Sequence, residues 1–251
     1  MAKNLFTFVV SDDNSGVFEK NIAKSKIYID KVFPFIRING FKKCVDSYSS
    51  ITITNSTYIA YAHNDVFFHE KFQDELISSI FKLNDIDCNW GVCGTAGVLN
   101  IRNNRSIQYP VSDGKIIAAK GPGYINIGCL KEKNNKKWGT ILLSPEYSTP
   151  SEISYLDECF LVVKNNQNLS FDTNIPYNHS YGLDICLQSQ NKGMKNYVLP
   201  ALVHHNCKDQ SERGPNVDFE LSECAKYIEN KYPSNMPCIT TSYTYGKNEI
   251  H

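Results

Sequence analysis

The chain has 251 residues with 26 basic and 26 acidic side chains, so its formal net charge at pH 7 is zero. That balance argues against a nucleic-acid-binding protein, because such proteins normally carry a basic stripe that contacts phosphates. A compact chain of this length buries roughly 70 to 75% of its unfolded surface. We therefore expect a core that needs neither disulfides nor a structural metal.

The cysteines and the start of the chain bear on the cellular compartment. There are nine cysteines, no Cys-x-x-Cys pair occurs, and Cys88 and Cys93 lack a second Cys/His pair at zinc-finger spacing. The apolar run near the start is too short for a signal peptide and is interrupted by Asp12 and Asp13. No apolar stretch approaches the ~20 residues that span a bilayer. We expect reduced cysteines in a soluble, cytoplasmic protein without a transmembrane segment.

The first hundred residues alternate between strand and helix patterns. A continuous apolar run predicts a buried strand at 5–10, and a loosely helical spacing follows at 17–29. Further strands are predicted at 32–38 and 58–62, and apolar residues at helical spacing predict a helix over 70–83. This alternation favours an α/β protein with a mainly parallel sheet.

The rest of the chain changes in character. Glycine-marked strands and loops are predicted from 92 to 127, and a buried strand at 160–163. A helix is predicted at 181–190, a last short strand at 197–203, and a further helix around 219–232. Because no repeat, low-complexity segment or linker interrupts the pattern, we expect one domain.

Two predicted strands end at acidic side chains. Ligands of open α/β sheets bind beyond the carboxyl ends of the strands, and Asp65 follows the strand at 58–62. A carboxylate there suits Mg²⁺ or Mn²⁺ bound to a diphosphate, although Asp65 could equally cap the following helix. Ser11 and Asp12 end the first strand and could hydrogen-bond a base or ribose, or be ordinary turn residues.

Two later segments contain candidate catalytic or metal-binding residues. Asp184 lies near the start of the predicted helix at 181–190, where it could be a general base or a first-turn acid that favours the helix dipole. His204 and His205 end the last predicted strand, where imidazole could bind a metal or simply fill the surface or core. Consecutive strand residues face opposite ways, so the sequence leaves open which histidine is the ligand.

The order of these features resembles the GT-A glycosyltransferases, particularly family 2-like enzymes. Residues 62–66, AHNDV, look like the His-x-Asp variant of the Asp-x-Asp metal motif. Residues 90–97 resemble the Gly-x-x-Gly strand of that group, 155–162 resemble the strand near the acceptor, and 169–187 resemble the segment with the catalytic aspartate. The resemblance covers roughly residues 5 to 207. It departs from the usual pattern at Glu158 and Gly182.

The resemblance implies a fold and a domain division. It implies a GT-A-type, Rossmann-like, mostly parallel central sheet flanked by helices in a single domain over 1–207. The nucleotide-sugar half would be about 1–100 and the acceptor half about 101–207. The segment 208–251 would be a C-terminal extension packed on the same domain, serving as a lid, a self-association surface or part of the acceptor groove.

The resemblance also implies a reaction, the transfer of a sugar from a UDP-, GDP- or dTDP-sugar to an acceptor hydroxyl, as on a glycan, with inversion. It implies a divalent metal, Mn²⁺ or Mg²⁺, and no nucleic-acid partner. The implied nucleotide-sugar residues are Val10, Ser11, Asp12, Asn39, His63, Asn64 and Asp65. The implied metal ligands are Asp65, His204 and His205, the acceptor residues are Asp157, Glu158 and Tyr181, and the base is Asp184.

Two other functions fit the composition less well. A sugar nucleotidyltransferase would normally show a phosphate loop rich in glycine and lysine after the first strand, whereas residues 11–16 are acidic and poor in glycine. A non-catalytic carbohydrate-binding or scaffold module could use the 15 tyrosines and 13 phenylalanines for stacking on sugars. Such a module would not need Asp65 or Asp184.

Overall fold

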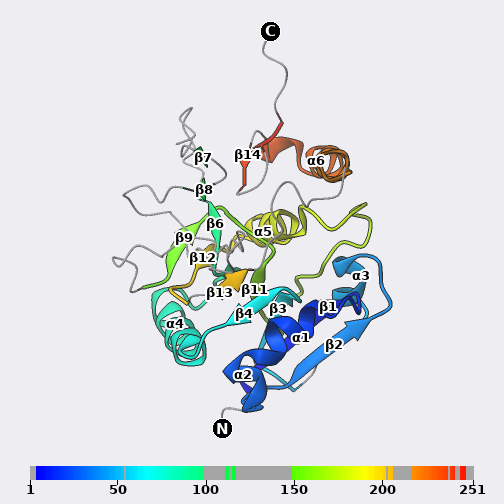
Figure 1. Ribbon diagram of the computed structural model, residues 1–251. Helices are drawn as coiled ribbons and strands as arrows, with labels where there is room; N and C mark the ends of the chain where they lie inside the picture. Colours follow the sequence, from blue (N-terminus) through cyan, green and yellow to red (C-terminus); the bar gives the residue numbers. More distant parts are fainter. Residues whose placement is uncertain are drawn as a thin grey trace.

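The computed structural model describes residues 4–53, 55–98, 111–112, 115–116, 149–201, 203–205, 216–236, 238–240 and 244–246. At its centre is a seven-stranded sheet in the order β2-β1-β3-β11-β5-β12-β9 (Figure 1). The strands of this sheet are β1 Phe6–Asp12, β2 Phe35–Asn39, β3 Tyr58–His63, β5 Val92–Gly94, β9 Ser151–Ile153, β11 Phe160–Lys164 and β12 Asn196–Val198. The chain is therefore an α/β protein.

Four two-stranded ladders accompany the central sheet. They are β4 Val66–Phe68 with β13 Val203–His205, β6 Gly97–Val98 with β10 Tyr155–Leu156, β7 Val111–Ser112 with β8 Lys115–Ile116, and β14 Cys238–Ile239 with β15 Thr244–Tyr245. The predicted glycine-marked region at 92–127 lies mostly outside the described residues, apart from β5 to β8.

The helices cover both faces of the central sheet. They are α1 Val17–Lys20, η2 Ile22–Lys24, α2 Lys26–Ile29, α3 Cys44–Ser49, α4 Phe72–Ile86, α5 Tyr181–Asn191, α6 Val217–Lys231 and η4 Pro233–Asn235. Phe72 of α4 packs on Phe160 of β11, whereas Tyr48 of α3 packs on Tyr61 of β3 and Tyr181 of α5. The register pairs Phe160 with Ala62, the neighbour of Tyr61, so these contacts lie on opposite faces.

The sheet is mixed but mostly parallel, since β1, β2, β3, β5 and β12 run in one direction and β11 and β9 run in the other. β1 pairs in parallel with β2 and β3, and β5 with β12. β11, however, runs antiparallel to both of its neighbours, β3 and β5, and β9 is antiparallel to β12. The apolar run of β11 predicted a buried strand, but hydrophobicity carries no information about strand direction.

Two predicted elements are divided in the structure. The helical pattern at 17–29 becomes α1, η2 and α2, which break at Asn21 and Ser25, and the Asn21 side chain bonds the Val17 carbonyl. The predicted strand at 197–203 becomes β12 and β13, which belong to different sheets. Pro200 lies between them, and a proline cannot donate a hydrogen bond to a ladder.

The C-terminal helix lies beyond α5, at the opposite end of the molecule from α1 and α2 (Figure 1). The Ser180 hydroxyl, just before α5, lies 2.8 Å from the Tyr245 hydroxyl in β15. Among the described residues, no helix is both long and apolar enough to cross a membrane. All the described cysteines are free thiols.

Candidate functional site

The carboxyl ends of β1 and β3 lie side by side, as parallel pairing requires. Their register sets Ser11 opposite His63, and the next residue, Asp12, is opposite Asn39 at the end of β2. The strands end here because polar residues replace the apolar run. Side chains from three strand ends therefore meet at one edge of the sheet, where ligands of open α/β sheets bind.

A second pairing brings His205 to this edge. β4 and β13 form an antiparallel ladder in which His205 is opposite Val66 and His204 is opposite Phe67. Because consecutive strand residues face opposite ways, only His205 turns toward Asp65. The His204 ring instead lies against the rings of Phe67 and His69. Of the two histidines, the structure therefore brings only His205 to the site.

His63, Asp65 and His205 form a compact triangle of donor atoms. His205 Nε2 lies 3.2 Å from Asp65 Oδ1 and 3.4 Å from His63 Nδ1, and the third edge, from His63 Nδ1 to Asp65 Oδ1, is 3.9 Å. A triangle with these edges has a point about 2.1 Å from all three corners, which is the ligand distance of Mg²⁺ or Zn²⁺. The three side chains can therefore hold one divalent cation with little movement.

The Asp65 carboxylate gives independent support for a cation. Among the described residues, its Oδ1 is a buried oxygen that accepts no hydrogen bond, although His205 Nε2 is 3.2 Å away. A buried oxygen without a hydrogen bond is costly unless a ligand satisfies it. Burial by itself raises the pKa of Asp65, but the His205 and His63 imidazoles outweigh it, so that pKa lies below its usual value. The carboxylate is therefore charged at neutral pH.

Tyr181 fixes the orientation of the His63 ring. The Tyr181 hydroxyl and His63 Nε2 form a short hydrogen bond, which leaves Nδ1 facing Asp65 and His205. Burial lowers the pKa of His63, and the Asp65 carboxylate only partly opposes this effect. A neutral imidazole is the form that binds metals, and it usually donates the N–H of its second nitrogen to a supporting acceptor, which here would be the Tyr181 hydroxyl oxygen.

The segment before β11 adds further donors. Because β11 is antiparallel to β3, the start of β11 lies at the end of β3, and the His63 amide donates to the Cys159 carbonyl at 3.1 Å. Asp157 and Cys159 are buried there, and the Asp157 carboxylate accepts the Cys159 amide at 3.0 Å. Asp157, Cys159 and His205 form a second group of mutually close donor atoms.

The predicted nucleotide residues at the end of β1 already have partners. Asp12 is buried, forms an ion pair with Arg37 of β2, and accepts a hydrogen bond from the Asn64 amide at 3.0 Å. Ser11 Oγ lies 2.9 Å from Ser47 Oγ of α3. Val10 is buried in the core, whereas Asn39 is exposed. Of the predicted side chains at this strand end, Asn39 is the one open to a ligand.

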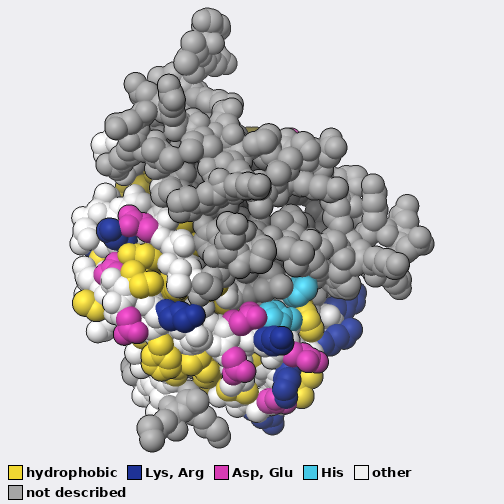
Figure 2. Space-filling model, turned by 90° about the vertical axis from the view of Figure 1, so that its left-hand side faces the viewer, with side chains coloured by type: hydrophobic (Ala, Val, Ile, Leu, Met, Phe, Trp, Pro, Cys, Tyr) yellow, Lys and Arg dark blue, Asp and Glu magenta, His cyan; other side chains and the backbone are white. Residues whose placement is uncertain are grey.

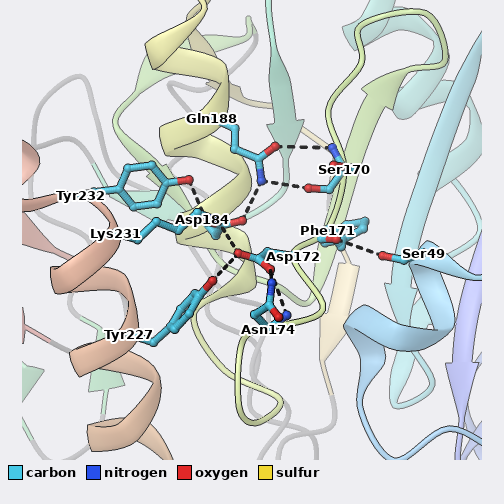
Figure 3. A network of polar contacts seen from close by, with 10 residues as sticks. All are labelled: Ser49, Ser170, Phe171, Asp172, Asn174, Asp184, Gln188, Tyr227, Lys231 and Tyr232. Carbon is cyan, nitrogen blue, oxygen red and sulfur yellow. Dashed lines mark hydrogen bonds and ion pairs between the residues drawn. The ribbon is translucent and has the colours of Figure 1, made fainter.

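The predicted base, Asp184, lies in a different environment. Figure 3 shows its carboxylate bound on both oxygens, with Lys231 and Tyr232 of the α6 region at 2.7 and 2.8 Å from Oδ1 and Gln188 at 2.7 Å from Oδ2. Its side chain is only 1% exposed. Lys231 also pairs with Asp172, whose carboxylate accepts the Tyr227 hydroxyl. The network joins α5 to α6, and it leaves Asp184 closed to an acceptor in this conformation.

Glu158 adjoins Asp157 and packs against Gly182 near the start of α5. Burial, followed by the neighbouring Asp157 carboxylate, raises the pKa of Glu158 to about 7. Its side chain lines a small cavity of about 20 Å³ together with Ser180 and Tyr245. A cavity of that volume has room for about one water molecule. A Cβ at Gly182 would lie 2.7 Å from the Leu156 carbonyl oxygen, so glycine there permits the close approach of α5.

Figure 2 shows histidine side chains gathered in one place on one face of the molecule, with acidic and basic side chains next to them. Arg37 and Cys159 were not predicted from the sequence to belong to the site. Arg37 carried a usable signal, since it is the one charged side chain in the apolar run at 32–38. Cys159 carried none.

No family model matches the chain. A Fuscovulum blasticum protein described as "ATP synthase subunits region ORF 6" is 25% identical over 190 residues, covering 75% of this chain and 67% of that protein. Two solved structures are similar at 10% identity. A197 from STIV has a TM-score of 0.41 over 81% of this chain and 86% of that one. The inositol-1-phosphate CTP transferase from T. maritima has a TM-score of 0.38 over 90% and 98%.

At these values the structural likenesses carry no argument about activity. The glycosyltransferase resemblance of the sequence therefore stays a prediction.

Proposed function

We propose that the protein is a metal-dependent, GT-A-type glycosyltransferase that moves a sugar from a nucleotide-diphosphate sugar to an acceptor hydroxyl. The observation that carries the proposal is the His63–Asp65–His205 triangle at the carboxyl end of β3, with a buried Asp65 oxygen that accepts no hydrogen bond from the described residues. Two imidazoles and one carboxylate suit Mn²⁺ better than Mg²⁺, which prefers oxygen ligands.

The residues in and around the triangle would have separate roles in binding the metal and the nucleotide. A divalent cation held by Asp65, His205 and His63 would neutralise the charge that develops on the departing diphosphate. Asn39 and the Ser11–Asp12 strand end would contact the base and ribose. Arg37, held by Asp12, keeps that carboxylate from repelling a nucleotide phosphate.

Two carboxylates, Asp184 and Glu158, are candidates for the general base. Asp184 is the sequence-based candidate, and its carboxylate would act only after Lys231 and Tyr232 withdraw. Glu158 is the rival, since a pKa of about 7 suits a general base at neutral pH. Asp157 and Tyr181 were predicted to contact the acceptor. Both are buried and bonded within the protein, so we assign Tyr181 to the support of His63.

The division into 1–207 and 208–251 is likewise a proposal. The contacts of Lys231 and Tyr232 with Asp184 support a C-terminal segment packed on the rest of the chain. In that position it would cover the acceptor side until a glycan acceptor displaces it.

A donor screen tests the proposed function. Purified protein would be incubated with UDP-, GDP- and dTDP-sugars and Mn²⁺ or Mg²⁺, and released nucleotide would be measured. We expect metal-dependent release from one donor and a loss of roughly 100-fold or more in Asp65→Asn. His204→Ala is the matched control, because His204 lies next to a ligand in sequence but faces away from the triangle, and it should keep the rate.

Other outcomes of the screen point elsewhere. Pyrophosphate release from a nucleoside triphosphate and a sugar phosphate would identify a sugar nucleotidyltransferase. Binding of sugars that persists in Asp65→Asn, without turnover of any donor, would identify a non-catalytic carbohydrate-binding module. Either result would overturn the glycosyltransferase proposal.

A further inference from the structure

A second set of donor atoms lies beside the triangle. Asp157, Cys159 and His205 bring one carboxylate oxygen, one sulfur and one imidazole nitrogen within 4.8 Å of one another. Cys159 is fully buried and Asp157 is 7% exposed. The set differs from the triangle in one chemical respect, which is that it contains a thiol.

We propose that Asp157, Cys159 and His205 bind a thiophilic divalent cation of the Zn²⁺ or Co²⁺ class, and that this cation competes with the Mn²⁺-type ion because His205 belongs to both donor sets. The binding itself is independent of the proposed function. The competition rests on the proposed function, because it needs a cation in the His63–Asp65–His205 triangle.

The donor types decide which cation each set prefers. A thiolate selects Zn²⁺ and similar ions over Mn²⁺ and Mg²⁺, whereas carboxylate and water suit the harder ions. In a tetrahedral zinc site with sulfur at ~2.3 Å and nitrogen at ~2.05 Å, the two ligand atoms are about 3.6 Å apart. The present separations, up to 4.8 Å, therefore need to close by only about 1 Å. Asp65, with Oδ1 3.2 Å from His205 Nε2, is within reach as a fourth ligand.

The backbone already holds Asp157 and Cys159 in place. The Asp157 amide donates to the Ala96 carbonyl, and the Asp157 carboxylate accepts the Cys159 amide, each at 3.0 Å. On the other side, the Cys159 carbonyl accepts the His63 amide at 3.1 Å. Because three hydrogen bonds fix this short segment, little conformational entropy is lost when an ion binds.

Binding at this set changes the charges and the protons of the site. The Cys159 thiol would release its proton to solvent as the metal–sulfur bond forms, and the dication would offset the buried Asp157 carboxylate and the new thiolate. His205 would then no longer complete the triangle with His63 and Asp65. A thiophilic cation would therefore inhibit the proposed transferase.

Cobalt absorption tests the binding. Metal-free protein would be titrated with Co²⁺, and thiolate-to-cobalt charge-transfer absorption would be followed. We expect the band in the wild type and its loss in Cys159→Ser. Cys93→Ser is the matched control, because Cys93 is equally buried on the neighbouring strand β5 and belongs to neither donor set. A wild type without the band, or a band that persists in Cys159→Ser, would overturn the proposal.

If Cys159→Ser does not fold, Asp157→Asn provides the same test. The asparagine oxygen can still accept the Cys159 amide, whereas it is a poorer metal ligand than a carboxylate. We expect the affinity for Co²⁺ to fall roughly tenfold in Asp157→Asn. An unchanged affinity would remove Asp157 from the set and contradict the proposal.

Displacement of Mn²⁺ tests the competition. Protein-bound Mn²⁺ would be measured by electron paramagnetic resonance while Zn²⁺ is added. We expect one equivalent of Zn²⁺ to release Mn²⁺ from the wild type, and Cys159→Ser to need roughly tenfold more. Equal displacement in both proteins would refute competition through the second set. A wild type that binds no Mn²⁺ would instead refute the proposed function, while the cobalt result would still stand.

Discussion

Two carboxylates in this protein, those of Asp184 and Asp65, differ in how far their oxygens are satisfied. Asp184 has hydrogen-bond partners on both oxygens, and Lys231 neutralises its charge. Asp65 has a buried Oδ1 to which the described residues donate no hydrogen bond, and the His63 and His205 imidazoles lie close to it. The first arrangement stabilises the contact of α5 with α6. The second leaves coordination capacity for a ligand.

The difference shows how a structural acid can be told from a functional one. Asp65 lies in the turn after β3 and Asp184 lies in the first turn of α5, and the sequence allows either to be an ordinary turn or helix-start acid. The partners separate them, because three hydrogen bonds and a lysine charge already occupy the Asp184 carboxylate in this conformation, whereas Asp65 Oδ1 accepts no hydrogen bond from the described residues.

The largest effect is expected at Asp184. Asp184→Ala removes the acceptor of the Tyr232 hydroxyl and one of the two carboxylates that pair with Lys231, which keeps Asp172. Loss of this buried acceptor should cost about 3 kcal/mol. Denaturant unfolding in EDTA would measure this loss. Asp65→Ala under the same conditions should change the unfolding free energy by less than about 1 kcal/mol. Equal losses in the two variants would break the comparison.

The next effect concerns the choice between neighbouring histidines. His205→Ala removes one corner of the donor triangle, and we expect the Mn²⁺ affinity to fall about 100-fold, or about 2.7 kcal/mol. His204→Ala should leave that affinity within about twofold, because the His204 ring packs against Phe67 and His69. Calorimetric titration with Mn²⁺ measures both. A larger loss in His204→Ala would show that the site uses the opposite face of β13.

A pH effect is expected at Glu158. Its folded-state pKa of about 7 lies above the ordinary 4.5, so the native state holds a proton that the unfolded state releases. The stability associated with this carboxyl is therefore full below pH 4.5 and is lost as the pH rises through 7. Each pKa unit corresponds to about 1.4 kcal/mol, and partial exposure reduces the total to about 2 kcal/mol.

Glu158→Gln should flatten this part of the stability profile. Glutamine cannot ionise, so the variant should be more stable than the wild type above pH 7 and nearly equal to it at pH 4.5. Thermal unfolding across that range would show the difference. Parallel profiles of the two proteins would mean that Glu158 has an ordinary pKa and would remove it as a candidate base.

The smallest effect is expected at Tyr181, which would not bind the metal itself. Its hydroxyl contacts the ring of His63, one of the proposed metal ligands. Tyr181→Phe removes the hydrogen bond to His63 Nε2 but keeps the aromatic packing against Tyr48 and Phe171. Loss of such a supporting hydrogen bond should lower the Mn²⁺ affinity about tenfold. ¹⁵N NMR of the His63 ring in the metal-free protein would show a mixture of tautomers in place of one. An unchanged spectrum would exclude the orienting role.

The elements that follow from local hydrophobicity were predicted well. β1, β3, β11, α4, α5 and α6 are all confirmed, with bounds that shift by a few residues. The errors concern properties that hydrophobicity does not encode. The direction of β11 depends on the connection that precedes it. The predicted strand at 197–203 is split because β12 pairs in the central sheet, whereas β13 pairs with β4.

The site shows the same division between local and distant information. Asp65 was predicted from its place after β3, since a strand end fixes where a side chain lies. His205 could not be separated from His204, because the choice depends on the pairing of β13 with β4. The partners of Asp184 come from a helix about 47 residues further along the chain, and no sequence pattern connects them.

The antiparallel course of β11 has a consequence for the order of folding. The donors His63 and His205 are 142 positions apart, and the Asp157–Cys159 segment reaches them only when β11 has entered the sheet between β3 and β5. Contacts so distant in sequence form late, because loop closure costs entropy before the contacts repay it. A cation that needs these donors would find no site in an early folding intermediate. It should therefore leave the refolding rate unchanged and slow unfolding instead, which makes metal-loaded protein kinetically long-lived.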